Sequence, residues 1–172
     1  MPLQLDLGHA ILRELVLNDA PSLALHANDW LVWVQLRDMF PHPYREEDAT
    51  EFIQRIQIQN QPTAFALAVN DQVVGVIGLI VQPDINRLSA EIGYWVGTAH
   101  WGKGIATAAV RALTTWSMAQ LGFVRIFATP FIHHVASCRV LEKAGYLREG
   151  LMRKSAIKDG QVLDQVLYAY VG

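Results

Sequence analysis

The middle of the chain contains a strand, a glycine-containing bend, a long helix and a second strand in succession. The sequence predicts the first strand in LSAEIGYWV (88–96), the bend in HWGKG (100–104), the helix over 102–121 and the second strand in VRIFATP (124–130). Gly122 ends the helix, as a glycine just past a helix commonly does. A strand–helix–strand unit normally forms a right-handed crossover between two parallel strands. We therefore expect a parallel pair in the sheet, and this expectation limits the fold more than any other feature.

The segments on either side of this unit predict antiparallel strands and further helices. TAFALAV (63–69) and QVVGVIGLIV (72–81) are joined by the turn signal Asn70–Asp71, and with 88–96 they form a meander. YLREGLMRKSAI (146–157) and QVLDQVLYAYV (161–171) form a last hairpin across KDG. With no repeat or linker to divide it, the chain is expected to be one mixed α/β domain over residues 1–172. The other predicted elements are a strand near 10–15 and helices within 18–29, 29–36, 45–59 and 135–144.

Composition argues against several classes of protein. The chain is 52% hydrophobic and carries 14 Lys and Arg against 16 Asp and Glu, without a block of like charge, so no nucleic-acid partner is expected. The longest apolar run, Val73–Val81, has nine residues, whereas a membrane-spanning helix needs roughly 20. Cys138 is the one cysteine and cannot form an internal disulfide, and MPLQLDLGH does not resemble a signal peptide. We expect a cytoplasmic protein without a membrane partner.

The bend HWGKG has the features of an anion-binding turn. Glycines let several backbone N–H groups point in one direction, and the positive end of the following helix adds to them. This arrangement suits a phosphate group. A strand-to-helix turn that needs glycine for its geometry alone is an equally good interpretation of the bend by itself.

Two nucleotide-binding patterns fail at positions that their chemistry requires. The P-loop pattern G-x-x-x-x-G-K-[ST] matches Gly97, Gly102 and Lys103, but Gly104 stands where a magnesium-binding hydroxyl is needed. The dinucleotide pattern G-x-G-x-x-G has Thr107 in place of its third glycine.

Three separated blocks resemble the GNAT acetyltransferases, and among them the RimJ/RimL type, which acetylates N-terminal amines of ribosomal proteins. The blocks are AEIGYWV…HWGKGIATAAVRAL, VASCRVLEKAGYLREGLMR and IKDGQVLDQVLYAYV, and the resemblance extends over about residues 10–171. It implies a GNAT fold: a mixed, mostly antiparallel sheet of six to seven strands whose central parallel pair splays apart, flanked by helices.

The resemblance also implies a binding site for acetyl-CoA. The family pattern [QR]-x-x-G-x-[GA] falls on 101–106, where Gly104 and Ala106 match and Trp101 replaces Gln or Arg. Lys103 either adds charge there or is a solvated surface lysine. Gly93 lets another backbone or a ligand approach its strand closely, or it marks a bulge. The cofactor-binding residues that the resemblance implies are Tyr94, Trp95, Val96, Gly102, Lys103, Gly104, Ile105, Ala106, Thr107, His134 and Ser137.

Acetyl transfer to an amine needs a modest base, a donor to the oxyanion and a thiolate that can leave. An α-amine has a pKa of roughly 7.7–8.0, so a carboxylate acting directly or through water suffices. Glu91 matches the acidic residue proposed as base in the RimL type; otherwise it is a strand glutamate that faces solvent or pairs with an arginine. Ser137 matches a serine that bonds or protonates the sulfur, and its alternative is a bond to its own helix backbone. An N–H near Trp95 or Val96 can donate to the oxyanion.

Three residues depart from the family pattern. His134 replaces an asparagine that contacts pantetheine, Ala108 replaces a frequent Glu, and Leu141 stands where many GNAT enzymes have a tyrosine. These departures motivate an alternative hypothesis, a CoA-binding regulatory or interaction module that has lost its chemistry. The other histidines and Cys138 have no partners at metal-ligand spacing, so no metal site is expected.

The acceptor is the least specified part of the sequence. In the resembling family the early helices line the amine pocket, which here means Trp30, Trp33, Phe40 and Tyr44, although a Trp-rich helix face is more often core. The expected partner is a primary amine, either a ribosomal-protein N-terminus or a small molecule. The resemblance also allows a homodimer.

Overall fold

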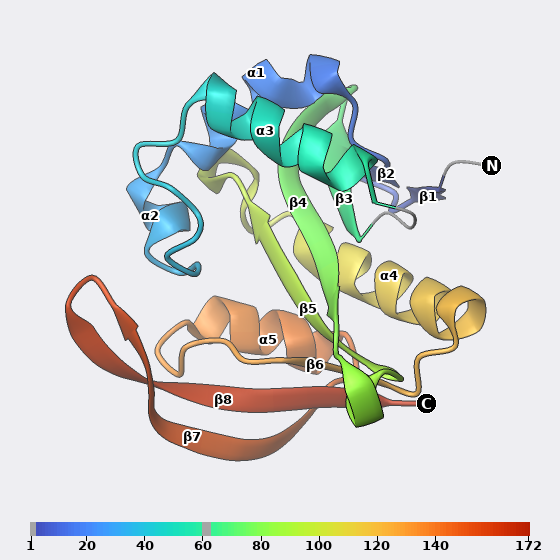
Figure 1. Ribbon diagram of the computed structural model, residues 1–172, viewed down its shortest axis with the longest axis vertical. Helices are drawn as coiled ribbons and strands as arrows, with labels where there is room; N and C mark the ends of the chain where they lie inside the picture. Colours follow the sequence, from blue (N-terminus) through green and yellow to red (C-terminus); the bar gives the residue numbers. More distant parts are fainter. Residues whose placement is uncertain (1–2, 60–62) are drawn as a thin grey trace. The chain divides into compact units, whose positions relative to one another are not determined.

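The computed structural model describes residues 3–59 and 63–172 (Figure 1). The chain forms two compact units, which share three elements. The first unit contains residues up to 78 together with 94–109, and the second contains 79–93 together with 110–172. The shared elements are β4 (Gln72–Val81), β5 (Ser89–Val96) and α4 (Ile105–Leu121).

The first unit is built on short antiparallel strands covered by helices. β1 (Gln4–Asp6), β2 (Ile11–Arg13), β3 (Ala64–Val69) and the start of β4 pair in sequence order, with Leu12 opposite Leu67. Two helices, α1 (Ala20–Ala27) and α3 (Glu46–Gln57), lie side by side over these strands (Figure 1). The unit also holds α2 (Trp30–Trp33) and the short 3-10 turns η1 (Leu17–Asp19) and η3 (Thr98–His100).

A buried apolar cluster joins these helices to the strands. Leu23 of α1 and Ile53 of α3 are fully buried in it, together with Val73 of β4. The apolar spacing of α3, with Ile53 and Ile56 on one side, explains why that helix forms and which face it buries. Burial of a large aliphatic side chain contributes about 1.5–3 kcal/mol, so this cluster is a main source of the unit's stability.

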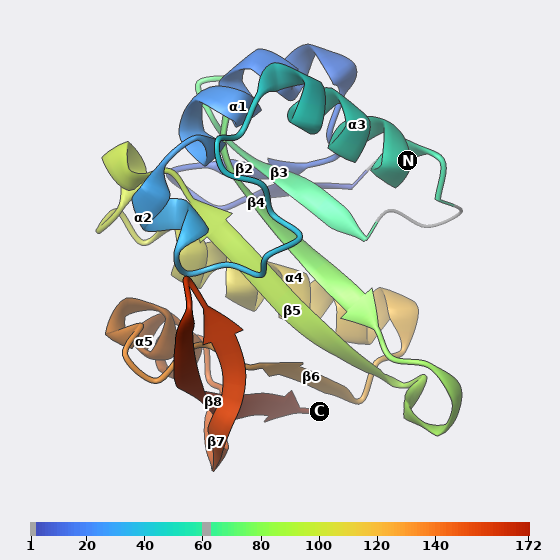
Figure 2. The ribbon, with the colours of Figure 1, turned by 60° about the vertical axis from the view of Figure 1, so that its left-hand side comes forward.

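The second unit contains the parallel pair. β5 and β6 (Arg125–Ala128) run parallel, with Ser89–Glu91 opposite Arg125–Phe127, as the crossover argument predicted. β8 (Gln161–Val171) pairs antiparallel with β6 and with β7 (Leu147–Lys158), and α5 (Val135–Lys143) packs against β7 (Figure 2). A 3-10 turn, η2 (Asp84–Asn86), connects β4 to β5.

A buried hydroxyl pair ties α4 to the segment after α5 in this unit. The Thr114 hydroxyl lies 2.7 Å from the Tyr146 hydroxyl, and the Tyr146 side chain is fully buried. Burial raises the pKa of Tyr146 far above its ordinary value, so the phenol stays neutral. Because the two buried hydroxyls are hydrogen-bonded to each other, the protein avoids the free-energy cost of burying a hydroxyl without a partner.

Hydrogen bonds join the strands in the order β1-β2-β3-β4-β5-β6-β8-β7. The GNAT fold expected from the sequence is confirmed: a mostly antiparallel sheet with one parallel pair. The described sheet has eight strands rather than six or seven, because the three-residue strand β1 is too short to leave an alternating pattern. Within the described residues, no helix is both long and apolar enough to cross a membrane.

Two helix boundaries differ from the sequence prediction. The α4 helix begins at Ile105 and not at Gly102, because Gly102 and Gly104 have φ angles of +73° and +77°, which a right-handed helix cannot contain. The α2 helix is a single turn of four residues, although the pattern DWLVWVQL predicted a longer one. β-Branched and aromatic side chains in that segment weaken its helix propensity.

The close backbone approach expected at Gly93 occurs at Gly75 instead. A Cβ atom on Gly75 would lie 2.3 Å from the carbonyl oxygen of Trp95 and 3.0 Å from the Cα atom of Val96. A Cβ atom on Gly93 would meet no described atom within 4 Å. The prediction of a backbone contact at Gly93 is therefore wrong, whereas a ligand contact there stays a prediction.

We predict that Gly75→Ala destabilises the protein by about 1–3 kcal/mol, because the added methyl group forces β4 away from Trp95. Gly93→Ala is the matched control and should change the free energy of unfolding by less than about 1 kcal/mol. Denaturant unfolding of the two variants measures the difference. Equal losses in both variants would show that the close approach at Gly75 has no energetic weight.

Candidate active site

The bend before α4 leaves its backbone open on the side of the two left-handed glycines. A Cβ atom added to Gly102 or Gly104 would meet no described atom within 4 Å, and both residues are exposed. The N–H of Ala108 bonds the Gly104 carbonyl at 3.0 Å, which closes the first turn of α4. The N–H groups of Ile105, Ala106 and Thr107 have no carbonyl four residues back within the helix to bond. The start of α4 therefore presents several donors and open space, as an anion site requires.

Side-chain bonds within the first unit hold this bend in place. The Thr98 hydroxyl donates to the Asp29 carboxylate at 2.8 Å, and Asp29 also accepts the N–H of Leu31 at 2.8 Å. The indole N–H of Trp101 donates to the Val96 carbonyl at 2.6 Å. Trp101 thus fastens the bend to the end of β5, which explains how tryptophan can stand at the family's Gln or Arg position. One acceptor site of the Val96 carbonyl is already used by this bond.

Gly97 is also required for packing at the end of β5. A Cβ atom there would lie 2.7 Å from Nδ1 of His26. The rings of His26 and His100 contact each other edge to face, with centroids 5.3 Å apart. Burial lowers the pKa of both histidines, and the nearby Lys103 lowers that of His100 further. Both rings are therefore neutral at pH 7.

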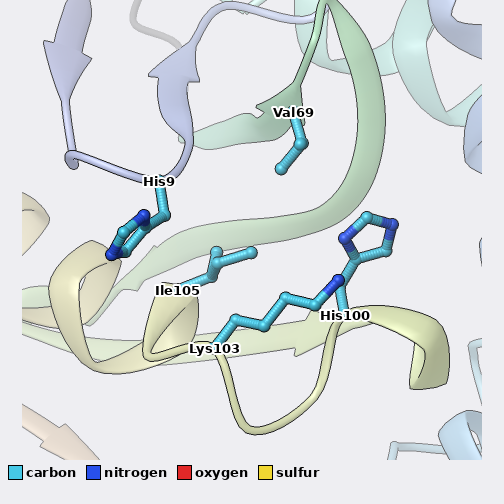
Figure 3. A pocket seen from close by; sticks show the side chains of 5 residues that line it. All are labelled: His9, Val69, His100, Lys103 and Ile105. Atoms are coloured by element: carbon cyan, nitrogen blue, oxygen red, sulfur yellow. The ribbon is translucent and has the colours of Figure 1, made fainter.

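A cavity of about 390 Å³ lies beside the bend (Figure 3). His9, Val69, His100, Lys103 and Ile105 line it, and in Figure 3 the aliphatic chain of Lys103 runs along it toward His100. Nδ1 of His100 is buried and has no hydrogen-bond partner among the described residues. Lys103, one of the residues predicted to bind the cofactor, thus belongs to the wall of this cavity, although its side chain is largely exposed.

The aromatic residues predicted to bind the acceptor fall into two groups within the first unit. Phe40 contacts Tyr44 at a centroid distance of 4.8 Å and Trp95 at 5.7 Å, and Tyr44 is buried. Burial raises the pKa of Tyr44 to about 12. Trp33 stacks on His42 at 5.5 Å, and Trp30 is half exposed. Tyr44 therefore packs in the core beneath Phe40, while Trp30, Trp33 and Phe40 retain accessible surface.

Glu91 lies in the second unit, at the last residue pair of the parallel ladder. Its partner in register is Phe127, and β5 continues beyond that pair to Val96. The Glu91 side chain is half-buried and accepts a hydrogen bond from the Thr129 hydroxyl at 3.1 Å. Side chains alternate along a strand, so Glu91, Gly93 and Trp95 belong to one face of β5. A carboxylate in this position is oriented by a donor, as a general base should be.

His134 and Ser137 lie at the start of α5, also in the second unit. His134 is the residue before the helix, and its carbonyl accepts the N–H groups of Ser137 at 3.1 Å and Cys138 at 3.2 Å. Both His134 and Ser137 are half-buried. Leu141, at the family's tyrosine position, is fully buried in the core, so this position contributes packing here.

The predicted site residues are distributed over both units. The first unit carries the bend, the end of β5 and the aromatic group, and the second carries Glu91, His134 and Ser137. Sequence reasoning missed Thr129, which bonds Glu91, and the clamp made by Trp101. The signal for Trp101 was its departure from the family pattern. Thr129 left no signal, because a threonine at the end of a predicted strand has many ordinary roles.

We predict that His134→Asn flattens the dependence of stability on pH. Burial lowers the pKa of His134, and the adjacent His133 lowers it further. The unfolded chain therefore binds a proton on this imidazole at a higher pH than the folded chain, so stability falls as the pH drops below about 6.5. From about pH 7.5 to about pH 5.5, the free energy of unfolding, measured with denaturant, should fall less for His134→Asn than for the parent. If the free energy of unfolding falls by as much in His134→Asn as in the parent, His134 is not a source of the pH dependence.

Comparisons with known proteins agree with this geometry. A family model described as "Acetyltransferase (GNAT) domain" matches residues 9–147. An uncharacterized N-acetyltransferase, p20 of Bacillus licheniformis, is 28% identical over 162 residues, which are 92% of this chain and 90% of that protein.

Two further similar proteins are named as ribosomal-protein acetyltransferases. The ribosomal-protein-serine acetyltransferase of Escherichia coli (strain K12) is 29% identical over 130 residues, 73% of this chain and 72% of its own. A solved structure of RimL, a ribosomal-protein α-N-acetyltransferase in complex with coenzyme A, has the same fold with a TM-score of 0.85 at 22% identity, and 98% of each chain is covered. Because the family model covers most of the sequence, the chain belongs to the GNAT acetyltransferases and is an acetyl-CoA-dependent acyltransferase.

Proposed function

We propose that this protein transfers the acetyl group of acetyl-CoA to a primary amine by direct attack in a ternary complex, and that the acceptor is a protein N-terminal α-amine. The observation that carries the proposal is the open bend at the start of α4, with two left-handed glycines and helix N–H groups that have no partner within the helix, in a chain of the GNAT family. Acetyl-CoA is the cosubstrate of this family, and its pyrophosphate suits a cradle of backbone donors without a magnesium-binding hydroxyl.

The cradle fits the cofactor on chemical grounds. Two negative charges are best held by oriented N–H groups and one nearby cation, and the bend offers the N–H groups from Gly102 to Thr107 with Lys103 beside them. The backbone of Tyr94, Trp95 and Val96 is proposed to bind the pantetheine arm. His134 and Ser137 are proposed to bind it nearer the thioester.

Acetyl transfer then follows a short sequence of bond changes. The neutral amine nitrogen attacks the thioester carbonyl carbon and forms the C–N bond, and the negative charge moves to the carbonyl oxygen. An N–H of Trp95 or Val96 is proposed to donate to this oxyanion. The proton of the attacking amine passes to Glu91, directly or through one water. The C=O bond then re-forms as the C–S bond breaks, and the thiolate leaves. Ser137 is proposed to donate a hydrogen bond to the sulfur, or to protonate it and regain a proton from water.

The acceptor assignment rests on the aromatic group and on the relatives. Trp30, Trp33 and Phe40 keep exposed aromatic surface, which suits an extended peptide end, and Tyr44 supports Phe40 from the core. The similarity to the ribosomal-protein-serine acetyltransferase of Escherichia coli favours a ribosomal-protein N-terminus over a small-molecule amine. A homodimer stays a prediction.

We predict that Gly104→Ala abolishes stabilisation by acetyl-CoA. Alanine at a φ of +77° costs about 1 kcal/mol and pulls the bend away from the cradle geometry. Gly122→Ala is the matched control, because Gly122 has a φ of +72° with equally open surroundings but lies past the opposite end of α4. Both variants should melt at a lower temperature, and only Gly104→Ala should lose the increase in melting temperature at saturating acetyl-CoA. Equal increases in the two variants would rule out the cradle.

Release of free thiol from acetyl-CoA, measured across a panel of N-terminal peptides and small amines, tests the proposed reaction. We expect release above background with peptides that begin with a small residue such as serine or alanine. Binding of acetyl-CoA without thiol release from any amine would instead favour a regulatory CoA-binding module.

The base assignment has its own test with the best acceptor of that panel. Glu91→Gln should lower kcat by roughly 10²-fold or more, since general-base catalysis contributes typically 10²–10⁴-fold. Glu149→Gln is the matched control, because Glu149 is an exposed carboxylate paired with Arg125 at 2.8 Å and should keep the parent's rate. An unchanged rate and pH profile in Glu91→Gln would show that Glu91 is not the base.

A further inference from the structure

A chain of hydrogen bonds extends from Glu91 to an irregularity in the last hairpin. The Thr129 hydroxyl donates to Oε1 of Glu91 at 3.1 Å, and the Thr129 carbonyl accepts from the side-chain amide of Gln165 at 2.7 Å. The amide oxygen of Gln165 accepts in turn from the Ser155 hydroxyl at 3.0 Å. All four residues belong to the second unit. Three side chains therefore connect the candidate base to β7.

Gln165 is well placed to fix the segment that carries Thr129. It lies opposite Met152 of β7 on one side and forms an isolated β-bridge with Phe131 on the other. Bonds from Val166 to the Pro130 carbonyl at 2.9 Å, and from Ile132 to the Asp164 carbonyl at 3.0 Å, hold the same segment to β8. Residues 129–132 are thus bound along β8, with Gln165 in the centre.

The irregularity in β7 explains how Ser155 reaches Gln165. The register shifts between Met152 and Ala156, and Lys154 within the shift has a φ of +50°. The N–H of Lys154 donates to the Asp164 carboxylate at 2.7 Å. The Ser155 hydroxyl shares its one proton between the Met152 carbonyl at 2.9 Å and Gln165. A bulge of this kind redirects a side chain that would otherwise follow the strand pleat. Here the redirected side chain is Ser155.

We infer that Thr129 and Gln165 are positioning residues for the general base: Thr129 fixes the Glu91 carboxylate, and Gln165 fixes Thr129. A donor held at Oε1 restricts rotation of the carboxylate about its last bond and so sets the direction in which the group accepts a proton. A base must lie within hydrogen-bond reach of the proton that it takes, so loss of this orientation slows the chemical step. This inference rests on the proposed role of Glu91 and assigns two residues that lie outside the sequence motifs.

The primary test compares two substitutions at Thr129 in the full chain. Thr129→Val keeps the shape and removes the hydroxyl, and it should lower kcat roughly 5- to 20-fold with the best acceptor peptide, because hydrogen bonds to charged groups are the stronger ones. KM for acetyl-CoA should change less than about twofold. Thr129→Ser keeps the hydroxyl and should restore kcat to within about threefold of the parent. Thr115→Val, at an exposed threonine of α4, is the matched control and should keep the parent's kcat.

A double-mutant cycle separates positioning from plain structural support. In a Glu91→Gln background, adding Thr129→Val should lower kcat by less than about a further twofold, because Thr129 acts through the carboxylate that this background lacks. The same loss in both backgrounds, or an unchanged kcat in Thr129→Val alone, overturns the inference. Gln165→Met removes both side-chain bonds and keeps the length. Gln165→Met should also lower kcat, and it replaces Thr129→Val as the test variant if Thr129→Val does not fold.

The outcomes also separate this inference from the proposed base. If Glu91→Gln keeps the parent's rate, the base assignment fails, and the positioning role falls with it. If Glu91→Gln is slow while Thr129→Val and Gln165→Met both react at the parent's rate, Glu91 remains the base and only the positioning role is overturned.

Discussion

The short parallel ladder between β5 and β6 is the constraint on which the rest of the second half of the chain depends. Three residue pairs, Ser89–Glu91 with Arg125–Phe127, make up that ladder. Two parallel strands cannot be joined by a tight turn, so the chain must leave β5, cross one face of the sheet and return. The bend, the 17-residue helix α4 and the stop at Gly122 are the parts of that return path. A crossover of this kind places a helix N-terminus directly after a strand, and the bend adds left-handed glycines to it.

Sequence reasoning succeeded wherever one local pattern decided the outcome. Gly122 and Gly145 both adopt positive φ after helices that the sequence predicted to end there, and the turn Asn70–Asp71 does so between predicted strands. It failed where tertiary contacts decide. The close approach at Gly75 depends on the carbonyl of Trp95, about twenty residues away along the chain, and a glycine in an apolar strand gives no sign of such a partner. The predicted length of α2 was wrong for a local reason, because the β-branched and aromatic side chains of that segment weaken its helix propensity.

The candidate site was predictable to a similar extent. The bend and Glu91 follow from spacing and resemblance, because backbone geometry and a carboxylate on a strand are expressed directly in the sequence. The contacts that hold them are not. Trp101 bonds a carbonyl five residues back, Asp29 holds Thr98 from 69 residues away, and Thr129 reaches Glu91 from 38 residues away. Each of these contacts depends on the path of a loop in the folded chain, which local sequence patterns do not predict.

The protonation states near the bend bear on how binding and chemistry respond to pH. Burial lowers the pKa values of His26 and His100, so both imidazoles are neutral at pH 7 and stay neutral as the pH rises. In the proposed cradle, the charge offered to a pyrophosphate therefore comes from backbone dipoles and from Lys103. An α-amine acceptor loses its proton between roughly pH 7 and pH 9. In the proposed reaction, affinity for the cofactor and reactivity of the acceptor are thus set by different groups. If the proposed acceptor and cradle are correct, a rise of the transfer rate with pH in that range reflects deprotonation of the amine rather than a change in the cradle.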